Sequence, residues 1–221
     1  MELQPSACSR QRKKRTQRRR DAKAFLCDFA SLREGFCFFD QKFALGRLLP
    51  FVVCSFLFSS PMPAAGQMIL SAIEKTVGSQ IPVPNLTWQE LQAKLASVDS
   101  AQYVLFDTRS KEEYEVSHLP KAVQVDPQMP VEQFFRQYED SLKNKNAVFY
   151  CSVGYRSSRF VQRVQKDLQK SGARIAFNLQ GGIFRWYTEN NAVFNAQGQT
   201  EEVHPYDEFW GGLLKERKKV K

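Results

Sequence analysis

The chain has 221 residues, of which 43% are hydrophobic and 25% charged, a composition typical of a globular protein rather than a disordered one. Its formal net charge is +9, but residues 1–66 carry 12 Lys/Arg against 5 Asp/Glu, so the remainder is close to neutral. That remainder shows no basic face with interleaved aromatic residues, which argues against nucleic-acid binding by the globular part.

The first 66 residues form a basic region that we expect to be solvated and without a fixed fold. Residues 10–20 are a polybasic run. Residues 48–58 are an apolar run of about 11 residues, preceded by a basic residue and followed by small ones. This is the layout of a secretory signal, with a cut expected at Ala65-Gly66, and the run is too short to cross a bilayer comfortably as a helix.

Two features leave other interpretations of this region open. The basic segment is about twice the usual length for a signal peptide, and Pro50 lies inside the apolar run, where it would bend a helix. Residues 48–58 could instead anchor the protein in a membrane, or translation could begin at Met62, at Met68 or at a non-Met start near residue 45. We therefore expect an exported, periplasmic or membrane-associated protein if residues 1–65 are translated, and a cytoplasmic one otherwise.

Residues 67–195 have the pattern of one compact domain, and residues 196–221 form a C-terminal extension. Short apolar runs indicate buried parallel strands, and apolar residues at helical spacing indicate helices. Thr87 and Glu90 are spaced as a capping box at the start of one helix. Alternating strands and helices predict an α/β fold, a parallel sheet of about five strands with helices on both faces. We expect strands over 103–106, 122–125, 147–150 and 174–178, an extended segment over 81–84, and helices over 68–75, 87–98, 112–116, 131–142, 155–171 and after Gly181-Gly182.

For three of the expected helices, the sequence also indicates which residues face the core or where the helix ends. The helix from Thr87 should bury Leu91, Leu95 and Val98, and the helix over 131–142 should bury Phe134, Phe135 and Tyr138. Gly172 should end the helix that follows Cys151. Phe184 and Trp186 are expected in the core.

Cys151 is the one cysteine after residue 54, and it follows the strand expected over 147–150. A lone cysteine forms no internal disulfide, and no Cys/His spacing here indicates zinc. Its simplest role is that of a small buried apolar residue. Ligands of parallel sheets, however, bind beyond the carboxyl ends of the strands, where this cysteine lies.

The residues after Cys151 are those that a reactive thiolate needs. A thiol is nucleophilic as the thiolate, and backbone N–H groups at a helix N-terminus favour an anion. Gly154 permits a tight turn, and Arg156 adds a planar positive charge suited to an oxyanion. Ser157 can donate a hydroxyl at the first turn of the helix.

The pattern Cys151-x-x-Gly154-x-Arg156-Ser157 after an apolar strand resembles the active-site loop of rhodanese domains. Residues 107–122 are similar to the family's Asp-x-Arg…Glu-Tyr…Gly-His-Ile-Pro-Gly-Ala stretch, and residues 181–186 to its closing Gly-Gly…Trp segment. Ser117 and Lys121 stand where the family usually has glycine, which affects the shape of that loop rather than the cysteine. The likeness covers about residues 82–190.

The resemblance implies a rhodanese-type, thiosulfate sulfurtransferase-like enzyme. Cys151 would take the outer sulfur of a donor such as thiosulfate or a persulfide, and pass it to a thiol acceptor, which could be a protein. No metal or organic cofactor is required. The surrounding loop would bind the substrate through Ser152, Val153, Gly154, Tyr155, Arg156 and Ser157.

Two other functions stay open. A cysteine-dependent phosphatase or arsenate reductase of related architecture would have five residues between the cysteine and the arginine, whereas four separate Cys151 from Arg156. A catalytically weak rhodanese-like binding or regulatory module is the other alternative, and loss of the cysteine would have favoured it.

Three further residues are expected to support the site. Asp107 and Arg109 should form an ion pair that fixes the loop after their strand, although both could face the site. His118 should organise its own loop, since a thiolate stabilised by backbone N–H groups needs no general base. His204 has no nearby ligand set, and the aromatic segment 203–210 should pack on the domain, with partner docking as the alternative.

Overall fold

The computed structural model describes residues 65–206 and 208–214, and the structural statements below concern these residues. The polybasic run, the apolar run and the expected cleavage point before Gly66 lie outside or at the edge of this range, so those predictions stay untested. No helix within the described residues is long and apolar enough to cross a membrane.

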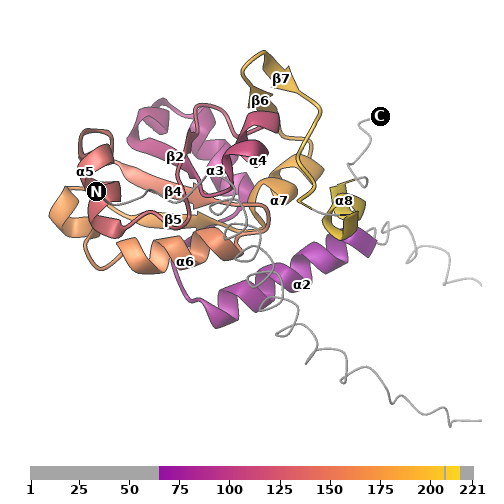
Figure 1. The fold of residues 1–221 in the computed structure, drawn as a ribbon, viewed down its shortest axis with the longest axis horizontal. Helices are drawn as coiled ribbons and strands as arrows, with labels where there is room; N and C mark the ends of the chain where they lie inside the picture. The colour runs from indigo at the N-terminus through magenta and orange to yellow at the C-terminus, as the bar shows by residue number, and fades with distance from the viewer. Residues whose placement is uncertain (1–64, 207, 215–221) are drawn as a thin grey trace, which may run out of the picture. The chain divides into compact units, whose positions relative to one another are not determined.

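A five-stranded parallel sheet forms the centre of the fold, which confirms the predicted α/β class (Figure 1). The strand order is β1-β5-β4-β2-β3. Asp107, which ends β2, pairs with Tyr150, which ends β4, so the chain segments that follow these strands emerge side by side. The strands are β1 (Asn85–Leu86), β2 (Tyr103–Asp107), β3 (Val123–Gln124), β4 (Asn146–Tyr150) and β5 (Ala176–Leu179).

The helices connect and cover these strands (Figure 1). Thr87 and Glu90 form the predicted capping box, with the Glu90 N–H donating to Oγ1 of Thr87 and the Thr87 N–H to the Glu90 carboxylate. The helices are α2 (Ala65–Gln80), α3 (Trp88–Ala96), α4 (Lys111–Val116), α5 (Val131–Leu142), α6 (Tyr155–Val164), α7 (Gly182–Thr188) and α8 (Glu208–Leu214), with 3-10 turns at Val98–Gln102 and Leu168–Ser171.

Aromatic side chains fill one face of the sheet. Phe106 of β2 and Phe149 of β4 stack with ring centroids 5.1 Å apart. Phe134 of α5 and Phe160 of α6 pack on them, 5.2 Å from Phe106 and from Phe149 respectively. Each such pair adds about 0.5–1.5 kcal/mol beyond the burial of its area. Leu105, which alternates to the opposite face, is also buried, so both faces of the sheet are covered.

Three expected helix boundaries were wrong. Ser97 ends α3 with an extended backbone and accepts a hydrogen bond from the Asp99 N–H, so a 3-10 turn begins and Val98 is 99% exposed rather than inward. The helix after the cysteine ends at Val164, because the chain tightens there into a turn closed by the Asp167 N–H. The first helix is longer than expected, Ala65–Gln80.

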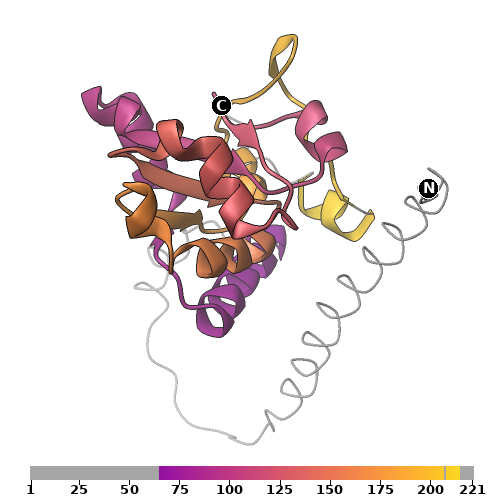
Figure 2. The same ribbon diagram turned by 60° about the vertical axis from the view of Figure 1, so that its left-hand side comes forward.

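The chain after α7 forms a hairpin and a final helix that were not predicted. Strands β6 (Val193–Asn195) and β7 (Gly198–Thr200) pair antiparallel, and this hairpin projects from the rest of the fold (Figures 1 and 2). The expected boundary at 195–196 falls at its turn. The chain then returns, and α8 packs against α2 and α7 (Figure 1).

Candidate functional site

Cys151 directly follows β4 and lies at the carboxyl edge of the sheet, 1% exposed. The chain turns sharply after it, and the N–H of Gly154 points back to donate a hydrogen bond to Sγ of Cys151 at 3.2 Å. Gly154 has a φ of +95°, a left-handed conformation that side chains rarely adopt. Helix α6 begins at the next residue, Tyr155. The thiol therefore lies at the positive end of a helix.

Helix α7 fixes the other side of this loop. The N–H groups of Ile183 and Phe184 donate to the carbonyl oxygens of Cys151 (2.9 Å) and Ser152 (3.0 Å). In a planar peptide unit the carbonyl and the following N–H point in opposite directions, so the N–H groups of Ser152 and Val153 point away from α7. A side chain at Gly182 would collide with both carbonyl oxygens, so the close approach of helix and loop requires glycine there.

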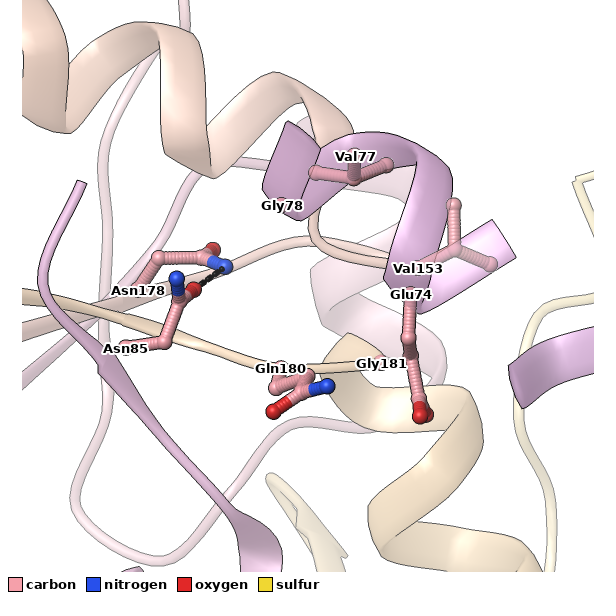
Figure 3. A pocket seen from close by; sticks show the side chains of 8 residues that line it. All are labelled: Glu74, Val77, Gly78, Asn85, Val153, Asn178, Gln180 and Gly181. Atoms are coloured by element: carbon pink, nitrogen blue, oxygen red, sulfur yellow. Dashed lines mark hydrogen bonds between the residues drawn. The ribbon is translucent and has the colours of Figure 1, made fainter. Parts of the chain in front are cut away.

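Hydrogen-bonded polar side chains connect the start of α6 to the neighbouring strands β5 and β1. Oγ of Ser157 donates to Oδ1 of Asn178 at 2.6 Å. Nδ2 of Asn178 in turn donates to Oδ1 of Asn85 at 2.7 Å (Figure 3). Beside these side chains lies a cavity of about 60 Å³, lined by residues that include Val153 of the loop and Glu74 of α2 (Figure 3). It has room for a few water molecules. Cys151 is not among its lining residues.

Arg156 is bound to Glu113 through both ends of its guanidinium. Nη1 donates to Oε2 of Glu113 at 2.9 Å and Nη2 to Oε1 at 2.8 Å. Nη2 also donates to Oγ of Ser152 at 2.9 Å, and that hydroxyl donates to Oε1 of Glu113 at 3.1 Å. The Glu113 side chain is 4% exposed and that of Arg156 28%. A buried carboxylate thus ties the start of α6 to residues 151–154, called the cysteine loop below.

The two charged groups of this pair stabilise each other in the ionised form. Burial raises the pKa of Glu113, but the hydrogen bonds and the charge of Arg156 outweigh it and lower the pKa from 4.5 to about 2. Burial lowers the pKa of Arg156, and the hydrogen bonds and charge of Glu113 more than reverse that, so its pKa is raised. Both groups are therefore charged at neutral pH.

Asp107 and Arg109 form the expected ion pair, with Nη2 of Arg109 2.7 Å from Oδ2 of Asp107 and both side chains fully buried. Asp107 also accepts the Arg109 N–H, and Nη2 of Arg109 donates to the Ser117 carbonyl. The pair thus joins the end of β2 to the loop that holds His118. Burial alone would lower the pKa of Arg109, but the charge of Asp107 leads to a raised pKa.

The remaining predicted residues lie around the loop or beside it. His118 stacks on Tyr114 with centroids 4.2 Å apart, and its backbone pairs with Phe194 of β6. Its ring nitrogen Nδ1 lies 2.9 Å from the Leu119 carbonyl. Val153 is buried and Tyr155 half-buried. Within the described residues, no group of three or more His, Cys, Asp or Glu side chains could hold a metal ion.

A protein-family model, that of the rhodanese-like domain, matches residues 87–189. The protein has a rhodanese-like domain. The matched range contains the cysteine loop, Glu113 and the glycines at the start of α7, Gly181 and Gly182. Helix α2 and the segment from β6 to α8 lie outside it. The rhodanese-like domain therefore carries additional chain on both sides.

Sequence and structure searches found several similar proteins. The chain is 34% identical over 128 residues to a probable molybdopterin-synthase adenylyltransferase of Porphyra purpurea, a match that covers 54% of this chain and 31% of that protein. The thiosulfate sulfurtransferase of Pseudomonas aeruginosa is 20% identical, with a TM-score of 0.43 over 67% of this chain and 26% of that one. A human single-domain sulfurtransferase is 27% identical, with a TM-score of 0.37 over 49% of this chain and 98% of that one. The chain thus spans about a third of the curated relative.

Sequence reasoning did not assign a role to three residues that the fold brings to the cysteine loop of the rhodanese-like domain. Glu113 lies three residues after Ser110, and this spacing predicts a capping box, which the structure contains. That spacing says nothing of Arg156, 43 residues further on. Asn178 and Tyr206 reach the loop from β5 and from the C-terminal segment, and no local pattern marks either of them.

Proposed function

We propose that this protein is a sulfurtransferase that accepts a sulfane sulfur on Cys151 as a persulfide and passes it to a thiophilic acceptor. The observation that carries the proposal is the geometry of the loop. The thiol follows a buried strand, accepts the Gly154 N–H and lies before the N-terminus of α6. Four residues separate it from Arg156, whose guanidinium is charged. These features favour an anionic sulfur.

The transfer proceeds in two steps. The Cys151 thiolate attacks the outer sulfur of thiosulfate, the sulfur–sulfur bond of the donor breaks, and its electron pair leaves with sulfite. Cys151 then carries a persulfide anion. A nucleophile, such as cyanide or a thiolate, next attacks the outer sulfur, and the electron pair of the broken bond returns to Cys151. The loop N–H groups stabilise the negative charge on sulfur in both states.

The size of the loop favours sulfur over phosphate chemistry. Four residues separate Cys151 from Arg156, one fewer than the five expected of a phosphatase, so the loop is smaller. A smaller loop suits a sulfur atom carried on the cysteine better than a tetrahedral phosphate.

The donor class follows from the site, and the acceptor class from the chemistry. A small anionic donor such as thiosulfate, or a persulfide, suits a thiol that is 1% exposed beside a positive guanidinium. The acceptor has to be a strong sulfur nucleophile, and a thiol of a small molecule or of another protein has that property. Neither step calls for a metal or an organic cofactor.

Sulfur labelling tests the proposal. The purified full chain is treated with thiosulfate, and peptide mass spectrometry is expected to find one added sulfur on the peptide with Cys151. The variant Cys151→Ser is expected to keep the fold, as judged by circular dichroism, and to take up no sulfur at this position. Hydrolysis of a phosphate ester without sulfur uptake would instead identify a phosphatase. Neither activity would leave a binding module as the function.

A further inference from the structure

The segment after β7, outside the range matched to the rhodanese-like domain, returns to the cysteine loop. Oη of Tyr187 donates to the Glu201 carbonyl at 2.7 Å and holds the beginning of the segment. Further on, the rings of Trp210 and Phe184 lie 6.2 Å apart. A side chain at Gly211 would come within 3.2 Å of Pro205, so the segment is packed tightly on its own final helix.

Tyr206 of this segment lies against Arg156. Cζ of Arg156 is 5.4 Å from the centre of the Tyr206 ring, within the range of a cation–π contact. Glu113 occupies the edge of the same guanidinium through both Nη atoms. The guanidinium thus binds Glu113 through its N–H groups and also lies over the Tyr206 ring.

The backbone holds Tyr206 in an unusual conformation for this contact. Its φ is +67°, in the left-handed region that large side chains avoid. The N–H of Tyr206 donates to Nδ1 of His204 at 3.0 Å, which stabilises the turn. Strained residues of this kind persist where surrounding contacts determine them, and they cluster at functional sites.

We propose that Tyr206 is a positioning residue of the sulfur-transfer site, supplied by a segment outside the rhodanese-like domain, which holds the Arg156 guanidinium beside Cys151 for binding of the anionic donor. The inference rests on the proposed sulfurtransferase function. Without the ring, the guanidinium is more hydrated and its charge more strongly screened, so the attraction for an anion weakens. The reacting cysteine itself is unchanged.

Steady-state kinetics with thiosulfate and cyanide test the role of Tyr206. The variant Tyr206→Leu is expected to raise the KM for thiosulfate about two- to fivefold, the factor that a cation–π contact at a partly exposed site supplies. The kcat should change less than the KM. Tyr206→Phe, which keeps the ring, is expected to restore the wild-type KM. Tyr103→Leu is the matched control, because Lys94 lies 5.4 Å from the Tyr103 ring, in a contact of the same length made by other elements.

Chemical modification gives a second readout that needs no sulfur transfer. Phenylglyoxal attacks exposed arginines, and peptide mapping is expected to show faster modification of Arg156 in Tyr206→Leu than in the wild type or in Tyr103→Leu. An unchanged KM together with unchanged modification of Arg156 overturns the inference, and so does a loss of kcat at constant KM. If Tyr206→Phe behaves like Tyr206→Leu, the hydroxyl and not the ring acts. Wild-type protein that takes up no sulfur overturns the proposed function, and this inference with it.

Discussion

The ion pair between Glu113 and Arg156 predicts a measurable loss of stability in the variant Glu113→Gln. Glutamine keeps the shape of the side chain but removes the charge that faces Arg156. The lowering of the Glu113 pKa from 4.5 to about 2 corresponds to about 3 kcal/mol of stability from the ionised carboxylate. We therefore expect Glu113→Gln to lower the free energy of unfolding by about 2–3 kcal/mol at pH 7, since the amide retains some hydrogen bonding.

The pH dependence of this difference has a definite sign. The pKa of Glu113 is lower in the folded state, so its contribution is present above about pH 4.5 and is lost as the pH falls towards 2. Urea unfolding followed by circular dichroism at pH 7, 5, 4 and 3 measures it. The difference between wild type and Glu113→Gln should be constant from pH 7 to 5 and shrink below that.

The same helix offers a matched control for this experiment. Glu115 lies 3.6 Å from Lys111 in a pair whose side chains are 61% and 77% exposed. Exposed pairs of this kind contribute little, so Glu115→Gln should change the free energy of unfolding by less than about 0.5 kcal/mol. The reasoning is refuted if Glu113→Gln is as small in effect as Glu115→Gln, or if its effect is the same at pH 3 as at pH 7.

Three further substitutions test the packing of α7 and α2. Gly182→Ala is expected to lower the free energy of unfolding by about 2–4 kcal/mol and to slow sulfur uptake at Cys151, because a Cβ there collides with the loop carbonyls. Gly78→Ala, in α2 with open space around it, should instead stabilise the protein by about 0.5–1 kcal/mol in the same urea titration. Arg185→Gln removes an ion pair with Glu74 at 2.7 Å, between side chains that are about nine-tenths buried. We expect the free energy of unfolding to fall by about 2–4 kcal/mol and α2 to be cleaved faster by proteases. An unchanged cleavage rate would contradict the role of this pair.

The central strands could be read from the sequence because they are buried on both faces. Tyr103–Phe106 and Ala147–Tyr150 are continuous apolar runs, and such runs are typical of parallel strands with helices on either side. Strand β1 has two residues, of which Leu86 alone is buried, so it leaves no comparable pattern. Helix α2 extends past the predicted range, and Glu74 and Ser71 on it bind Arg185, more than 110 residues away. Contacts between residues so far apart in the sequence do not affect the local spacing of apolar residues, so they cannot be predicted from it.

In the candidate site too, local features could be predicted from the sequence, whereas contacts between distant residues could not. The position of Cys151 after a strand, and of Gly154 in a tight turn, followed from local sequence because strand, turn and helix are adjacent there. The partner of Arg156 did not, since Glu113 lies on α4, after the neighbouring strand β2 and 43 residues earlier in the sequence. Sequence reasoning assigned Arg156 to the donor, and the structure adds that a carboxylate already occupies the edge of its guanidinium.

The hydrogen bonds from α7 to the carbonyls of Cys151 and Ser152 also bear on how the loop moves. Helix α7 begins after Gly181 with no side-chain cap, so the loop carbonyls occupy N–H groups that its first turn would otherwise leave unpaired. Loop and helix therefore satisfy each other's backbone hydrogen bonds. If either one opened locally, buried polar groups of both would be exposed. Opening of the loop is then coupled to a larger cooperative unit of the fold, unlike the independent fluctuation of a surface loop. Cys151 is therefore held by part of the protein's folding free energy rather than by the stiffness of its loop alone.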